Sequence, residues 1–161
     1  SLIHFNARSL RKHTDDITNF LSSVGHRFSI ICLTETWLSI SDKNLYDFPS
    51  YSAEYCHRAG SSHGGAAIFI SSGFHYHRRH DLTLNLPSCE SVWAEFHESF
   101  FSQDGKNIIV GCIYRSPSSS TSEFCLALSE VLHKLSIKRK NVIILVDINI
   151  NLIDTNTSCY N

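Results

Sequence analysis

The sequence predicts one layered domain of the mixed α/β (α+β) class. Three observations support this prediction: apolar, β-branched runs typical of strands, two segments with helical spacing of apolar residues, and the alternation of both types along the chain. Of the 161 residues, 42% are hydrophobic and 18% are charged, which suffices for a sizeable core. We therefore expect residues 1–161 to form a single domain.

The expected order is strand, helix, strand, a group of strands, helix and strand. Most of the expected strands are continuous apolar runs, which are typical of strands buried on both faces. Residues 92–96 alternate between apolar and polar, which predicts a half-buried strand. The expected strands cover residues 2–5, 28–33, 51–55, 66–70, 74–77, 92–96, 108–114 and 142–146.

Two segments carry apolar residues three or four positions apart, the spacing of an amphipathic helix. For the first helix, Ser9 is the expected N-cap and Gly25 the expected C-terminal residue. Its apolar face is predicted from Ile17, Phe20, Leu21 and Val24. The face of the second is predicted from Phe124, Leu128, Val131, Leu132 and Leu135.

Composition and charge narrow the class of protein. The net charge of −1 gives no global attraction to nucleic acid, and the basic clusters at 8–13, 77–80 and 138–140 read as solvated faces unless one lies beside a site. No apolar run approaches the roughly 20 residues that span a bilayer, so we expect no membrane partner. Six cysteines lack Cys-x-x-Cys spacing. We interpret them, above all Cys32, Cys112 and Cys125, as buried free thiols of an intracellular protein.

Three of the expected strands run into an oxygen-bearing side chain. These side chains are Asn6, Glu35 and Asp147, and Asn149 follows two positions later, where strand alternation predicts the same face. In layered α/β folds, ligands bind at the carboxyl ends of strands. A fourth strand runs into Tyr114 and then Arg115.

This set of side chains suits phosphodiester cleavage. Mg²⁺ prefers hard oxygen ligands and often takes only one or two carboxylates, which fits Glu35. Asp147 could orient or deprotonate an attacking water, and the phenol and guanidinium of Tyr114 and Arg115 suit phosphate oxygens. The pattern alone leaves a second interpretation open, in which the carboxylates face solvent or cap helices and the Tyr-Arg pair is packing plus surface charge.

Five strings in this order resemble the endonuclease/exonuclease/phosphatase family, and more narrowly the apurinic-endonuclease-like domain of non-LTR (LINE-type) retrotransposons. They are FNARSLRKH at 5–13, ICLTETWL at 31–38, GGAAIFI at 64–70, GCIYRSPSS at 111–119 and VIILVDININL at 142–152. The resemblance covers essentially the whole chain. It implies a four-layered α/β sandwich of the DNase I-like type, with the site at the top of two packed sheets.

The resemblance also implies roles for the candidate residues. Asn6 and Glu35 would lie at the metal, Mg²⁺ or Mn²⁺, and Tyr114 would contact the scissile phosphate, with Arg115 beside it. Asp147 and Asn149 match the family's Gly-Asp-x-Asn motif. The implied reaction is nicking of target DNA to leave a 3′ hydroxyl that primes reverse transcription. The implied setting is a longer polyprotein with a reverse transcriptase domain that functions in the nucleus.

Two departures from the family pattern shape these expectations. Val146 stands where the family has Gly, and a β-branched residue there is expected to crowd the turn. The family's later Ser-Asp-His segment does not occur, and the chain contains no Met. We therefore expect a C-terminally incomplete domain, weak or inactive by itself. The alternatives are a phosphoesterase of the same fold that acts on lipid or inositol phosphates, and a catalytically dead retroelement remnant.

Overall fold

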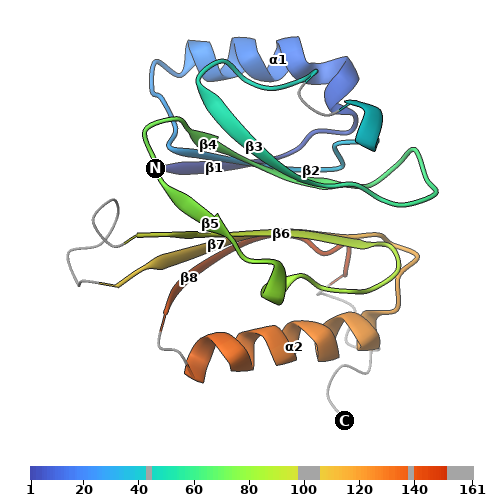
Figure 1. Ribbon diagram of the computed structural model, residues 1–161. Helices are drawn as coiled ribbons and strands as arrows, with labels where there is room; N and C mark the ends of the chain where they lie inside the picture. The colour runs from blue at the N-terminus through green and yellow to red at the C-terminus, as the bar shows by residue number, and fades with distance from the viewer. Residues whose placement is uncertain (43–44, 98–105, 138–139, 152–161) are drawn as a thin grey trace.

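The computed structural model describes residues 1–42, 45–97, 106–137 and 140–151, which form four layers (Figure 1). Two four-stranded sheets face each other in the middle. Helix α1 (Leu10–Ser23) covers the outer face of one sheet, and helix α2 (Thr121–Ile137) covers the outer face of the other. The predicted four-layered α/β sandwich is thus confirmed.

The first sheet places the ends of two parallel strands side by side. Its strand order is β1-β2-β4-β3, with β1 (Leu2–Asn6), β2 (Ile30–Thr34), β4 (Ala66–Ser71) and β3 (Tyr51–Cys56). Strands β1 and β2 are parallel, with Asn6 paired to Thr34. Because parallel strands end at the same edge, Asn6 and the residue after β2, Glu35, are brought together there.

The second sheet repeats this arrangement with its last two strands. Its order is β5-β6-β7-β8, with β5 (Tyr76–Arg78), β6 (Cys89–Phe96), β7 (Ile108–Arg115) and β8 (Asn141–Asp147). Strands β7 and β8 are parallel, and Tyr114 pairs with Asp147 in their register. Two 3-10 helices, Ile40–Asp42 and His80–Leu82, complete the described elements.

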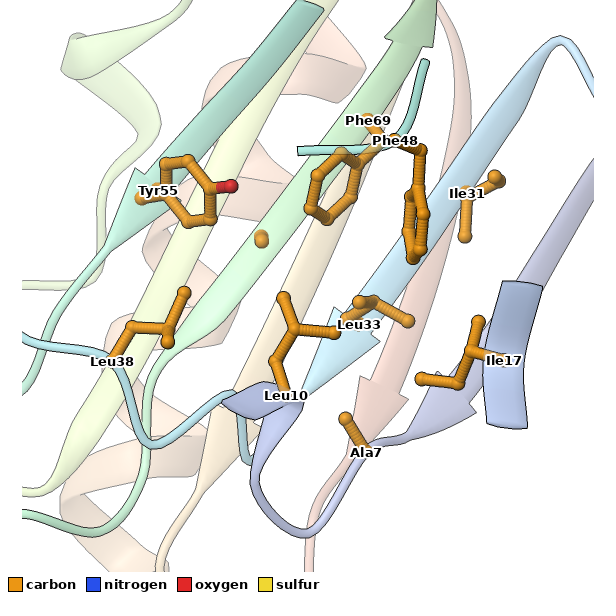
Figure 2. Close-up of a cluster of buried hydrophobic side chains, with 10 residues drawn as sticks. Ala7, Leu10, Ile17, Ile31, Leu33, Leu38, Phe48, Tyr55 and Phe69 are labelled. Carbon is orange, nitrogen blue, oxygen red and sulfur yellow. The ribbon is translucent and has the colours of Figure 1, made fainter. Parts of the chain in front are cut away.

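The core beneath α1 shows why this segment is a helix. Leu10 and Ile17 point from α1 onto Ile31 and Leu33 of β2 and Phe69 of β4 (Figure 2). Burial of each such side chain contributes about 1.5–3 kcal/mol. The predicted apolar faces are too wide, however, because three of their members lie at the rim and are 43–46% exposed. These members are Phe20, Val24 and Leu132.

Two strand predictions are wrong in detail. Strand β6 is buried on both faces, not one, because the other sheet covers Val92, Ala94 and Phe96 while Trp93 faces the layer of α2. Strand β8 was expected to be fully buried, but it is an edge strand, and Ile143 is 39% exposed.

Two further expectations, the cap at Ser9 and the burial of the cysteines, have mixed outcomes. Ser9 does precede α1, but its side chain makes no capping hydrogen bond, and its backbone has φ 89°. Cysteines 32, 56, 89 and 112 are free thiols, yet Cys125 is exposed on α2, so its predicted burial is wrong. Cys159 lies outside the described residues. No helix in the described ranges is long and apolar enough to span a membrane.

Candidate active site

The side chain of Asn6 connects two carboxylates that come from different sheets. Its amide nitrogen donates to Glu35 Oε1 at 3.1 Å and to Asp147 Oδ2 at 2.7 Å. Its Oδ1 accepts a hydrogen bond from the backbone N–H of Arg8 at 3.2 Å. Three of the predicted site residues are therefore in direct contact, although Asn6 and Asp147 are 141 positions apart.

Glu35 lies on a loop with unusual backbone geometry. Glu35 and Trp37 have φ values of 52° and 53°, in the left-handed region that non-glycine residues seldom occupy. The Glu35 carbonyl accepts from Ser9 N at 2.9 Å, and Trp37 N donates to the Gly64 carbonyl at 2.9 Å. Such conformations persist where surrounding contacts over-determine them, and they cluster at functional sites.

The charges at this position suit a divalent cation. Neither Glu35 nor Asp147 has an ion-pair partner among the described residues. Within the same ranges, no group of three or more His, Cys, Asp or Glu side chains could hold a metal. The two carboxylates and the amide oxygen of Asn6 remain as possible metal ligands. An all-oxygen set with few protein ligands is what Mg²⁺ takes when water and phosphate complete its shell.

Tyr114 places a phenol beside these carboxylates. It is 5% exposed, and its register partner on β8 is Asp147. Burial, and then the negative charge of Glu35, raise the pKa of Tyr114 to about 12. The phenol therefore keeps its proton at neutral pH and can donate a hydrogen bond to an anionic oxygen.

Arg115 is placed differently from the sequence-based expectation. Its side chain is buried, and the guanidinium donates to the carbonyls of Ile148 and Ser119 and to Thr121 Oγ1. It thus ties the segment after β8 to the segment before α2. A phosphate contact by Arg115 stays a prediction, and it would need some of these bonds to be released.

Asn149 lies just beyond β8, which ends at Asp147. The same-face argument therefore fails, since strand alternation stops before Asn149. Its backbone has φ 50°, and its side-chain N–H donates to the Arg115 carbonyl at 2.8 Å. The crowding expected from Val146 does not arise. Val146 takes part in regular pairing with Ile113, and its side chain is 38% exposed.

The sequence matches no family model and no curated protein. Solved structures resemble the chain more clearly. The AP endonuclease LMAP from Leishmania major has a TM-score of 0.66 at 18% identity, over 95% of this chain and 56% of that one. An endonuclease/exonuclease/phosphatase family protein from Bacteroides thetaiotaomicron has a TM-score of 0.66 at 15% identity, over 96% and 65%. The human Nocturnin catalytic domain has a TM-score of 0.64 at 13% identity, over 93% and 64%.

The chain has the endonuclease/exonuclease/phosphatase fold. At these identities the likeness shows the fold alone. The chain spans less than two thirds of the length of each of these three structures.

Within this endonuclease/exonuclease/phosphatase fold, one group near the site was not predicted from the sequence. His4 precedes Asn6 by two positions on β1 and hydrogen bonds with Thr34 Oγ1 at 3.3 Å. Burial lowers the pKa of His4, and the Asp147 carboxylate partly opposes this effect. Arg8 is exposed on the loop that follows Asn6. The side-chain type of His4 alone gave no indication of its placement, whereas Arg8 belongs to the basic cluster at 8–13 that the sequence singled out.

The three basic clusters have different surroundings. The cluster at 8–13 lies beside the site, so the sequence-based condition for a phosphate-binding role is met. Within this cluster, however, Arg11 is paired with Asp42. In the cluster at 77–80, Arg78 and Arg79 are paired with carboxylates, so the interpretation as a solvated face is wrong for them. Lys140 pairs with Glu95, and residues 138–139 lie outside the described ranges.

Proposed function

We propose that this chain belongs to a divalent-metal-dependent phosphodiester hydrolase that nicks DNA. The observation that carries the proposal is the bridge made by Asn6 between Glu35 and Asp147, two carboxylates with no paired cation in the described residues. Such a site attracts Mg²⁺ or Mn²⁺ and a phosphate bound to that ion.

Glu35 and the amide oxygen of Asn6 would hold the ion, and Asp147 is within reach of the same position. When bound, Mg²⁺ polarises a phosphoryl oxygen and stabilises the leaving oxyanion. The Asn6 amide fixes the orientation of both carboxylates through its two N–H donors. This leaves each carboxylate with further oxygen lone pairs that can accept other bonds.

The remaining steps use the chain's own proton donors and acceptors. Asp147 would orient the attacking water and accept its proton. Tyr114 would donate its phenolic proton in a hydrogen bond to a non-bridging phosphate oxygen, since its pKa of about 12 keeps it protonated. Asn149 would hold the Asp147 segment in place by its bond to the Arg115 carbonyl.

DNA is the favoured substrate for three reasons. The five sequence strings resemble the endonuclease of non-LTR retrotransposons, one structural neighbour is an AP endonuclease, and the exposed Arg8 lies on the loop that follows Asn6. On this proposal the nick supplies a 3′ hydroxyl for reverse transcription. The native protein would carry a reverse transcriptase domain and would act in the nucleus.

The proposal is tested by nicking of supercoiled plasmid with Mg²⁺ or with EDTA, using the 161-residue chain and Glu35→Ala. We expect slow, Mg²⁺-dependent nicking at most. The family's Ser-Asp-His segment does not occur in these residues, and loss of one transition-state partner typically costs about 10²–10³ in rate. Nicking that Glu35→Ala leaves unchanged would contradict the proposed site. Fast nicking that is lost in Glu35→Ala would support the proposed site and would contradict only the expectation that this chain has weak activity.

Two alternatives are outcomes of the same set of assays. Faster turnover of phosphoinositides than of supercoiled DNA would favour a lipid or inositol phosphoesterase of the same fold. Salt-sensitive DNA binding that is unaffected by Mg²⁺ or by Asp147→Ala would favour a dead remnant that only binds nucleic acid.

A further inference from the structure

A buried ion pair connects the two sheets beside the candidate site. Arg58 follows β3 in the first sheet, and Glu90 lies on β6 in the second. The pair is bidentate: Arg58 Nε donates to Glu90 Oε1 at 2.8 Å and Arg58 Nη2 to Oε2 at 2.9 Å. The side chains are 14% and 5% exposed, and Arg58 also donates to the Ser88 carbonyl at 3.1 Å.

The same pair supports the loop that carries Glu35. The Gly65 N–H donates to Glu90 Oε2 at 2.9 Å in a buried contact. The carbonyl of the preceding Gly64 accepts the hydrogen bond from Trp37 N at 2.9 Å. A Cβ on Gly64 would meet the Arg58 guanidinium at 2.7 Å, so the turn packs directly against the pair. Displacement of the pair is therefore transmitted through this turn to the segment 35–37.

Tyr114 forms the other side of this arrangement. The Arg58 guanidinium carbon lies 5.5 Å from the centroid of the Tyr114 ring, within the range of cation–π contacts. Tyr114 is also the register partner of Glu90 between β6 and β7. One guanidinium thus contacts the phenol ring directly and the Glu35 loop through Glu90 and the glycine turn.

We propose that Arg58, held by Glu90, is a positioning residue that fixes the Tyr114 ring and the Glu35 loop relative to each other. This rests on the proposed function, in which Tyr114 contacts the phosphate and Glu35 holds the ion. An arginine suits the task because its planar fork binds a carboxylate at two points while its face packs on an aromatic ring. Lysine offers only a point charge on a flexible stem.

The chain contains a matched control. Arg78 on β5 and Glu54 on β3 form a second Arg–Glu ion pair between the same two sheets. Arg78 also donates to the Tyr55 carbonyl, and its bonds include none to Asn6, Glu35, Tyr114 or Asp147. Arg78→Met therefore removes a comparable pair without a change at the candidate site.

The test uses ¹⁹F NMR on the 161-residue chain. 3-Fluorotyrosine placed at position 114 reports on the ring, and 5-fluorotryptophan reports on both tryptophans. Trp37 lies on the Glu35 loop, while Trp93 is 1% exposed in the core and serves as the folding control. In Arg58→Met we expect the Tyr114 and Trp37 resonances to shift or broaden while that of Trp93 stays in place. In Arg78→Met we expect all three to stay in place.

The proposal is overturned if Arg58→Met leaves the Tyr114 and Trp37 resonances unchanged, or if Arg78→Met moves them equally. Arg58→Met alone could unfold, because Glu90 would be left as a lone buried charge. In that case the double variant Arg58→Met with Glu90→Gln is measured instead, and the same changes in the resonances decide the outcome. Gln keeps an acceptor for Gly65 N–H and leaves no unpaired charge. These resonances do not depend on cleavage. Nicking that Glu35→Ala leaves unchanged would therefore contradict the proposed function without deciding the positioning role.

Discussion

The amide nitrogen of Asn6 donates a 2.7 Å hydrogen bond to Oδ2 of Asp147, and so joins the last residue of β1 to the last residue of β8. The contact spans the two sheets of the sandwich. Each strand ends beside a parallel neighbour, so the contact also brings the segments after β2 and β7 to the same place. The candidate site is therefore a product of sheet packing and not of any single motif.

Replacement of Asn6 by Ala is expected to lower the affinity for Mn²⁺ by at least about 10–100-fold, the usual effect of removing a group that orients metal ligands, because Asn6 would also supply its amide oxygen to the ion. Without the bridging N–H groups, Glu35 and Asp147 lose their fixed orientation and repel each other. Isothermal titration calorimetry measures the change. Asn107→Ala is the control, because Asn107 makes a similar 2.8 Å bond to a carboxylate, that of Glu95, among different partners. Equal losses in both variants would contradict a specific role of Asn6.

Replacement of Arg115 by Met distinguishes a structural clamp from a phosphate ligand. We expect the free energy of unfolding to fall by about 1–3 kcal/mol, since the part-buried acceptors at Ile148, Ser119 and Thr121 lose their donor. Urea unfolding followed by circular dichroism measures this change. Wild-type stability combined with weaker DNA binding would instead favour the phosphate contact predicted from the sequence.

Gly111→Ala is expected to destabilise the fold by about 1–3 kcal/mol through overpacking. A Cβ at Gly111 would approach the Trp93 ring to 2.4 Å, so the indole must move within a closely packed layer. The same urea experiment applies. Gly73→Ala is the control, because a Cβ at Gly73 meets no atom within 4 Å. An unchanged free energy of unfolding in Gly111→Ala would show that the residues around Trp93 rearrange more easily than their close packing implies.

Asp42 is expected to make stability depend on pH in the acid range. Hydrogen bonds from Arg11 and Ser39 lower the pKa of Asp42 from 3.8 to about 2. In this window the unfolded chain binds the proton and the folded chain does not, so stability rises with pH. The contribution is complete above about pH 4 and is lost as the pH falls through about 2. Urea unfolding of Asp42→Asn at several pH values should show a flatter acid limb than the wild type. Parallel acid limbs would contradict this.

Strand and helix positions could be predicted because apolar periodicity reports which elements are buried. Periodicity does not report what covers each face. Strand β6 reads as half-buried because Glu95 interrupts it, yet the Glu95 carboxylate is held by Arg79, Lys140 and Asn107 from other segments. Strand β8 reads as buried although it lies at a sheet edge.

The candidate site also combines residues that the sequence could predict with residues whose placement depends on packing. Asn6, Glu35 and Asp147 could be found from the sequence because each follows an apolar run, and the structure brings them together. Arg58 could not, because it lies in a polar loop 32 positions from Glu90. Glu90 could not be found either, because it precedes the strand that the sequence predicts at residues 92–96. The clamp role of Arg115 also depends on acceptors that reach it only through folding.

The most direct test of the central claim is a crystal of the 161-residue chain soaked in Mn²⁺, with the ion located by its anomalous scattering. The expected result is one peak bounded by the side chains of Asn6, Glu35 and Asp147, and its loss in Glu35→Gln. A peak elsewhere with this position empty, or a peak that persists unchanged in Glu35→Gln, would contradict the account.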